Sequence, residues 1–156
     1  MLKRRNLIIA TAAFLAGLLA TLLYLREPTV RLNEETLAQA RARWRNAGIR
    51  SYEAHYKMHG SLYKVRVRNG LVEDLLVNGQ PPSIAQVGAY SMNGLFDTLQ
   101  TELENITDES GPLGANVVAR VRFDDRLGYP QRYIRSSGGL SRGSSLEMLE
   151  FKPLAN

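Results

Sequence analysis

The chain has 156 residues, with 20 Lys and Arg against 15 Asp and Glu, two His and no Cys. The lack of Cys excludes disulfides, thiolate metal sites and a lipid-modified N-terminal Cys. Three of the basic residues lie in Lys3-Arg4-Arg5, and the other 17 nearly balance the acidic ones, so the basic pI is poor support for nucleic-acid binding.

Residues 7–25 are an apolar run of nineteen residues without a charge, directly after the basic cluster. A helix of this length covers about 28 Å, close to the ~30 Å hydrocarbon core of a bilayer. Basic residues favour the cytoplasmic side of an inner membrane. We therefore expect residues 1–6 to be a cytoplasmic basic tail, residues 7–25 a single transmembrane signal-anchor, residues 26–32 a linker and residues 33–156 a periplasmic α+β domain.

Two alternatives concern the same apolar run. A cleaved signal peptide has a shorter apolar core that ends in small residues, whereas this run continues through Thr21-Leu22-Leu23-Tyr24-Leu25 and has no A-x-A pattern near its end. Ala13, Gly17 and Thr21 recur at every fourth position, which lets two helices approach closely. We weigh homo-oligomerisation through this stripe against an ordinary Ala-rich span, and favour the ordinary span.

The residues after the linker predict a helix. Asn33 is a suitable N-cap before Glu34-Glu35, and Gly48 is a suitable C-terminal cap. Between the caps, apolar residues recur at helical spacing. These are Leu37, Ala40, Trp44 and Ala47. We expect this helix to pack on a sheet, with Trp44 between the two.

Three strands follow the helix. Apolar and charged residues alternate from Tyr52 to Met58 and again from Tyr63 to Arg68, as in strands with one buried face. Asn69-Gly70 predicts a two-residue primed turn into a third strand that ends near residue 77. The turn predicts that residue 66 faces residue 73 and that residue 67 faces residue 72.

The second half repeats the order of a helix and three strands. Ser91 is expected to cap a helix with an apolar stripe formed by Met92, Leu95, Phe96, Leu99 and Leu103. Residues 117–123 alternate as a strand, residues 124–128 predict a turn, and Pro130 allows a strand to begin beside it. Residues 136–145 are rich in Gly and Ser, and a last strand is expected over residues 146–152.

Several short motifs resemble those of an uncharacterised family of bacterial envelope proteins, known as a domain of unknown function. They are Trp44…Gly48-Ile49…Tyr52, Val65-Arg66-Val67-Arg68-Asn69-Gly70, Leu95-Phe96-Asp97 and Phe123-Asp124…Leu127-Gly128-Tyr129-Pro130. The resemblance covers roughly residues 34–152. It implies a cell-envelope location and an α+β fold but no reaction. This chain has His59-Gly60-Ser61 where members of the family often carry a Cys pair.

The predicted fold class is therefore α+β: an N-terminal transmembrane helix followed by a two-layer domain. The order of elements in the domain is α-β-β-β-α-β-β-β. Its sheet is mostly antiparallel, and both helices cover one face.

No residues predict a catalytic, cofactor or metal site. Gly139-Leu140-Ser141-Arg142-Gly143 matches the G-x-S-x-G nucleophile elbow, but the elbow needs a strand before it and a helix after it. His55 and His59 lie roughly 13 Å apart on a strand, too far to share a metal ion. The adjacent Asp124 and Asp125 suit a turn better than paired-carboxylate chemistry.

One predicted surface is distinctive by its charge. Six basic residues are expected on the sheet face that the helices leave open, together with both His and few acids. They are Lys57, Lys64, Arg66, Arg68, Arg120 and Arg122. Such a face suits anionic lipid headgroups, a cell-wall polymer or an acidic protein, although it is also compatible with an ordinary solvated face.

The predicted function is a non-enzymatic, membrane-anchored binding or accessory module of the bacterial envelope, without a cofactor. Its expected partners are a lipid bilayer through residues 7–25 and an envelope protein or anionic polymer through the basic face, with no role for nucleic acid. The alternatives are a small envelope serine hydrolase that uses Ser141, and a structural subunit that assembles through its transmembrane helix.

Overall fold

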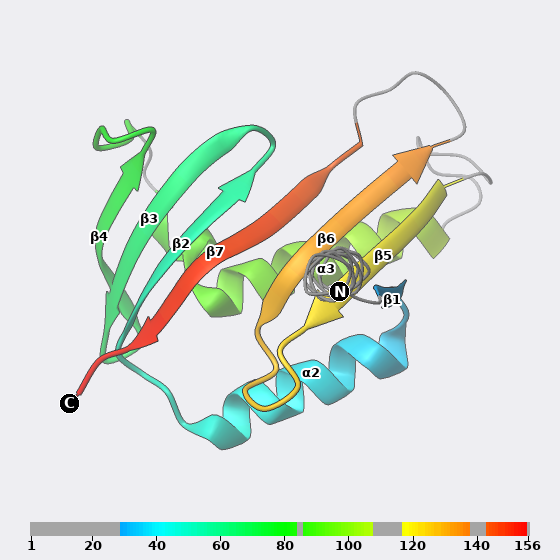
Figure 1. Cartoon of the computed structure of the whole chain (residues 1–156), viewed down its shortest axis with the longest axis horizontal. Coiled ribbons are helices and arrows are strands. Elements are labelled where there is room, and N and C mark those ends of the chain that lie inside the picture. Colours follow the sequence, from blue (N-terminus) through cyan, green and yellow to red (C-terminus); the bar gives the residue numbers. More distant parts are fainter. Residues whose placement is uncertain (1–28, 84–85, 108–116, 138–142, 156) are drawn as a thin grey trace, which may run out of the picture.

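The computed structural model describes residues 29–83, 86–107, 117–137 and 143–155, in which one antiparallel sheet carries two α-helices on one face (Figure 1). The strands are β1 (Val30–Arg31), β2 (Tyr52–Met58), β3 (Ser61–Arg68), β4 (Leu71–Val77), β5 (Val117–Phe123), β6 (Pro130–Ser137) and β7 (Ser145–Pro153). The helices are α2 (Glu34–Ala47) and α3 (Met92–Thr107), with a 3-10 helix, η1 (Val87–Tyr90), before α3.

The strand order is β1-β5-β6-β7-β2-β3-β4. Two meanders, β2-β3-β4 and β5-β6-β7, are joined where β7 pairs with β2 from Tyr52↔Pro153 to Met58↔Leu146. The last strand of the chain therefore lies in the middle of the sheet (Figure 1). Residues far apart in the sequence, such as those of β5 and β2, share one continuous surface.

The predicted fold class is wrong in two respects. Among the described residues, no helix is long and apolar enough to cross a membrane, so the structure does not support the N-terminal transmembrane helix. The predicted segment, residues 7–25, lies outside the described residues. In addition, the order of elements begins with a strand, because Val30 and Arg31, expected in a linker, pair with Val121 and Arg120 of β5.

The antiparallel sheet and the two helices on one face agree with the prediction. The buried residues of both helices form one core with the buried residues of the sheet. In α3 the buried residues are Met92, Leu95, Phe96, Leu99 and Leu103, the predicted stripe. Because only this stripe is apolar, α3 covers the sheet on one side and meets water on the other.

The caps of α2 are the ones that the sequence predicts. The Asn33 side chain accepts from the Thr36 N–H, and Thr36 Oγ1 accepts from the Asn33 N–H. Gly48 ends the helix with φ +63°. Ala47, which was expected on the buried stripe, is exposed, because it lies in the last turn, beyond the part of the helix that the sheet covers.

Aromatic residues connect α2 and the start of α3 to the sheet. The Trp44 ring lies 5.6 Å from the Tyr52 ring and 5.8 Å from the Phe151 ring, both edge to face. The Tyr52 hydroxyl accepts from the Met92 N–H at 2.6 Å. The first N–H groups of a helix have no partner within the helix, so this buried hydroxyl stabilises the start of α3.

The β3–β4 hairpin turns at Asn69-Gly70, as predicted, with both residues at positive φ. Its register differs from the prediction at one position. Arg66 faces Asp74 rather than Glu73, because a bulge shifts the pairing before Val67. A bulge leaves one residue of a strand without a partner on the other strand.

The β5–β6 turn packs against the backbone of α2. Oδ1 of Asp124 accepts from the backbone N–H groups of Arg126 and Leu127, which confirms the predicted turn role of this Asp. Gly128, at φ +81°, lies so close to α2 that a Cβ there would be 2.3 Å from the Ala40 carbonyl oxygen. This turn therefore determines how closely the helix approaches the second meander.

Because of its buried Tyr hydroxyls, the domain should lose stability as the pH rises into the alkaline range. Burial raises the pKa of Tyr52 to about 12, against the opposing effect of the Met92 N–H. Burial, with neighbouring Tyr hydroxyls, also raises the pKa of Tyr56. In the unfolded chain the pKa of a Tyr hydroxyl is about 10, so the folded state holds these protons more tightly.

We expect the free energy of unfolding to be unaffected by these groups below about pH 10 and to fall as the pH rises from about 10 through 12. Urea unfolding of the wild type and of Tyr52→Phe at a series of pH values measures this effect. The variant should be less stable at neutral pH, because it lacks the hydroxyl that accepts from Met92. It should also lose less stability above pH 10, and an identical alkaline slope in the two proteins would contradict the assignment.

Candidate binding surface

All six predicted basic residues lie on strands at positions that alternate with buried ones, so the sheet points them away from the helices. In β2 and β3 the residues next to them, such as Tyr56, Val65 and Val67, are buried, and in β5 so are Ala119 and Val121. The predicted residues on β2 and β3 are Lys57, Lys64, Arg66 and Arg68, and those on β5 are Arg120 and Arg122. Except for the half-buried Arg122, they are exposed.

The structure divides these six residues into two groups, because β6 and β7 lie between β5 and β2. The sheet does not bring Arg120 and Arg122 next to the basic residues of β3. The six residues share the open face of the sheet, as predicted, but they do not form one continuous patch. The open face therefore has two halves, one formed by β2, β3 and β4 and the other by β1, β5 and β6, and they differ in their balance of basic and acidic residues.

The half formed by β2, β3 and β4 is balanced by acids. Arg66 forms an ion pair with Glu53 at 2.8 Å, and Arg68 contacts Glu73 at 3.4 Å. Asp74 of β4 also lies opposite Arg66. The expectation of few acids does not hold for this half, whose two arginines form ion pairs within the sheet.

The half formed by β1, β5 and β6 is strongly basic. Arg31 lies directly opposite Arg120, and Arg122 lies directly opposite Arg132. These three strands contain no Asp or Glu. The nearest acid in register is Glu147 of β7, which pairs with Arg132 and with Lys57 of β2. We define the arginine edge as Arg31, Arg120 and Arg132, all of which are exposed.

Arg120 is held in place by the chain that enters β1. Its Nε donates to Thr29 Oγ1 at 2.9 Å, and its Nη2 donates to the Thr29 carbonyl at 2.6 Å. These bonds hold the guanidinium in place. A fixed fork of N–H donors loses less side-chain entropy when it meets a phosphate or carboxylate.

Arg31 and Arg132 are not among the six predicted basic residues. Arg31 falls within the predicted linker, and Arg132 lies in the strand predicted to begin beside Pro130. A possible signal was the alternation of Arg132 and Ile134 with the buried Tyr133. No pattern in the sequence could show that β1 pairs with β5.

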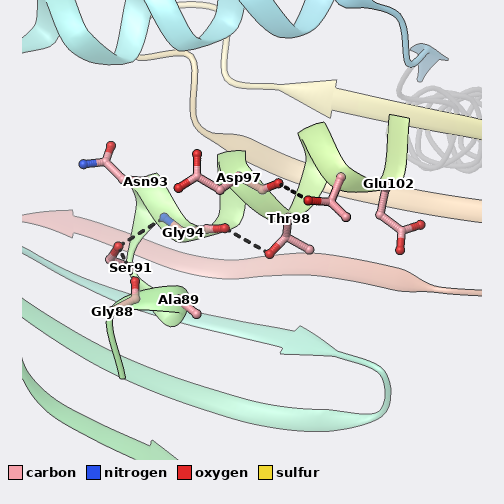
Figure 2. Close-up of a pocket in the computed structure, with 9 residues that line it drawn as sticks. Gly88, Ala89, Ser91, Asn93, Gly94, Asp97, Thr98 and Glu102 are labelled. Atoms are coloured by element: carbon pink, nitrogen blue, oxygen red, sulfur yellow. Dashed lines mark hydrogen bonds between the residues drawn. The ribbon is translucent and has the colours of Figure 1, made fainter. Parts of the chain in front are cut away.

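A hollow of about 450 Å³ runs along the exposed side of α3 (Figure 2). Its polar side chains bond to the protein itself: Thr98 donates to the Gly94 carbonyl, Asp97 pairs with Arg41, and Asn93 accepts from Trp44. At its far end, Tyr133 and Arg135 both donate to Glu102. These groups are already satisfied, so the hollow offers little polar chemistry to a ligand.

The hydrolase alternative gains no complete site. Ser141 lies outside the described residues. His59 lies in the β2–β3 turn, and its Nε2 is 2.6 Å from Oγ of Ser144, a distance typical of a nucleophile and its base. Ser144 is only 8% exposed, however, and among the described residues His59 has no carboxylate partner to orient it.

His55 and His59 have different environments. Nδ1 of His55 lies 3.0 Å from a Glu150 carboxylate oxygen on the open face, whereas His59 bonds to Ser144 in a turn. In the part of the chain that the structure describes, no group of three or more His, Cys, Asp or Glu could hold a metal ion.

Comparisons of the chain with protein-family models, curated proteins and solved structures find no match. The resemblance to the envelope family therefore stays a prediction from the sequence.

Proposed function

We propose that this protein is a non-catalytic binding or accessory module of the bacterial envelope, and that it engages an anionic partner through the open face of its sheet. The observation that carries the proposal is the separation of charge on that face. In the half formed by β2, β3 and β4 both arginines form ion pairs with glutamates, whereas β1, β5 and β6 have basic side chains and no acids.

The register of the arginines supports this proposal. Like charges directly opposite each other in neighbouring strands are destabilising, and the second half has such a pair in Arg31↔Arg120. An external anion between the guanidinium groups removes this repulsion. Arg groups also bind phosphate and carboxylate through paired N–H donors.

The envelope location rests on the sequence alone, through the basic cluster at residues 3–5, the apolar run 7–25 and the family resemblance. A nucleic-acid partner is disfavoured, because the chain beyond the basic cluster has 17 basic and 15 acidic residues. The expected partner is therefore an anionic polymer, an acidic envelope protein or an anionic lipid surface.

Salt-dependent retention of the full-length protein on a sulfated-polymer resin, in mild detergent, tests the proposal. The double variant Arg120→Glu/Arg132→Glu should elute at clearly lower salt, with an affinity reduced at least about 10-fold, because it replaces two cations that attract the polymer with two anions that repel it. Lys64→Glu/Lys152→Glu is the matched control. It changes the net charge equally at two exposed positions away from the arginine edge, on β3 and on β7 opposite Glu53.

The control variant should elute close to the wild type. Equal shifts for both variants would mean that only net charge matters, and no shift for either would overturn the proposal. Far-UV circular dichroism of each variant establishes that it is folded.

A further inference from the structure

We propose that the arginine edge binds the headgroups of anionic phospholipids, so that the open face of β1, β5 and β6 lies against the membrane surface. This inference rests on the proposed function and names the anionic partner of the same face. It follows from the place where the chain enters the sheet, from the flat arrangement of the arginines and from the apolar residues between them.

The first observation is the short connection between the arginine edge and the apolar run. Five residue steps separate Leu25 from Val30, and a fully extended chain spans at most about 3.6 Å per residue. Val30 therefore lies within roughly 18 Å of the end of the apolar run. Thr29, in this connection, bonds directly to Arg120. Any lipid surface that the apolar run contacts is thus close to the arginine edge.

The second observation is that the arginines come from neighbouring strands of one sheet. Arg31 and Arg120 face each other across β1 and β5, and Arg132 lies one strand further, on β6. Side chains on one face of a sheet form a broad, shallow array. Such an array suits many phosphate groups in a plane, whereas a single small anion is better held in a deep pocket.

The third observation is that exposed apolar residues lie beside the arginines, which favours a lipid surface over a fully hydrated polymer. Val118 lies on the open face of β5, two residues from Arg120, and is 43% exposed. Ile134 lies directly opposite Arg120 on β6 and is partly exposed. Binding to the interface of an anionic bilayer is strengthened both by basic residues and by apolar residues that become buried in it. A fully hydrated polymer offers no apolar surface against which these side chains could be buried.

A probe on the open face tests the inference in the full-length protein. Because the chain has no Cys, Ser136→Cys places a single polarity-sensitive fluorophore at an exposed position of β6. The labelled protein is added to vesicles of phosphatidylcholine alone or with about 30 mole per cent phosphatidylglycerol. Thr98→Cys, exposed on α3, is the matched probe on the opposite side. Any insertion of residues 7–25 is common to both vesicle types.

We expect a blue shift of the probe at position 136 with phosphatidylglycerol vesicles only, and no such difference at position 98. About 1 M sodium chloride, where the screening length is about 3 Å, should abolish the shift. The variant Arg120→Glu/Arg132→Glu should need at least about 10-fold more anionic lipid for the same shift, and Lys64→Glu/Lys152→Glu should behave as the wild type.

An equal signal from the two vesicle types, or an equal loss in both charge variants, would overturn the inference. If the arginine variant still loses retention on the sulfated resin while the vesicle result is negative, the anionic partner is a polymer or an acidic protein, and the proposed function stands without the lipid. If both experiments are negative, the proposed function fails with it.

Discussion

Replacing Gly128 with Ala should lower the free energy of unfolding by about 2–5 kcal/mol. Two costs add. A residue with a Cβ at φ +81° is strained by about 1–2 kcal/mol, and the added Cβ would lie 2.3 Å from the Ala40 carbonyl oxygen and 2.8 Å from Cβ of Arg43. Because the closest atom belongs to the helix backbone, α2 must move, and such overpacking costs about 1–3 kcal/mol.

Gly70→Ala is the matched control for this prediction. Gly70 has nearly the same φ, +84°, but its added Cβ would meet nothing within 4 Å. It should therefore show only the conformational cost of about 1–2 kcal/mol. Urea unfolding followed by circular dichroism measures both variants. Equal losses would mean that the contact between the β5–β6 turn and α2 does not limit the packing.

Trp44→Ala should destabilise the domain by about 3–5 kcal/mol, the usual cost of removing a buried aromatic residue. Trp44 is 5% exposed, and its ring packs edge to face on Tyr52 and Phe151. Its Nε1 donates to Asn93 at the start of α3. Truncation thus loosens the contacts of α2 with the sheet and with the second helix at the same time.

Asn93→Ala separates these contributions. It removes only the acceptor of the indole N–H, so its cost should be about 1 kcal/mol, while the ring contacts remain. Far-UV circular dichroism during urea unfolding measures each variant, because removal of the only Trp eliminates its fluorescence. A loss below about 1 kcal/mol for Trp44→Ala would contradict a central packing role for this residue.

Features that depend on neighbouring residues in the chain were predictable. The Asn33 and Gly48 caps, the Asn69-Gly70 turn and the turn that contains Asp124 all lie where the sequence places them. Each depends on the backbone preferences of one or two residues or on a hydrogen bond over a few positions. The buried stripe of α3 follows from helical periodicity in the same way.

The candidate site was predictable only in part. Alternation assigned the basic residues to the face that the helices leave open, since a strand points successive side chains to opposite faces. It could not show that Glu53 neutralises Arg66, nor that Arg31 and Arg132 join Arg120. The predicted patch combined residues from two halves of the sheet that differ in charge balance.

The positions of most helices and strands, and the side of each strand that faces the core, can be read from the sequence alone. These properties follow from local backbone geometry and from the burial of apolar side chains. The neighbours of each strand are known only from the fold: β7 lies in the middle of the sheet, and β1 lies beside β5. Backbone hydrogen bonds between strands are chemically alike for nearly all residues, so they do not specify which strands pair. The packing of the whole core selects the strand order. The arginine edge is a consequence of that order.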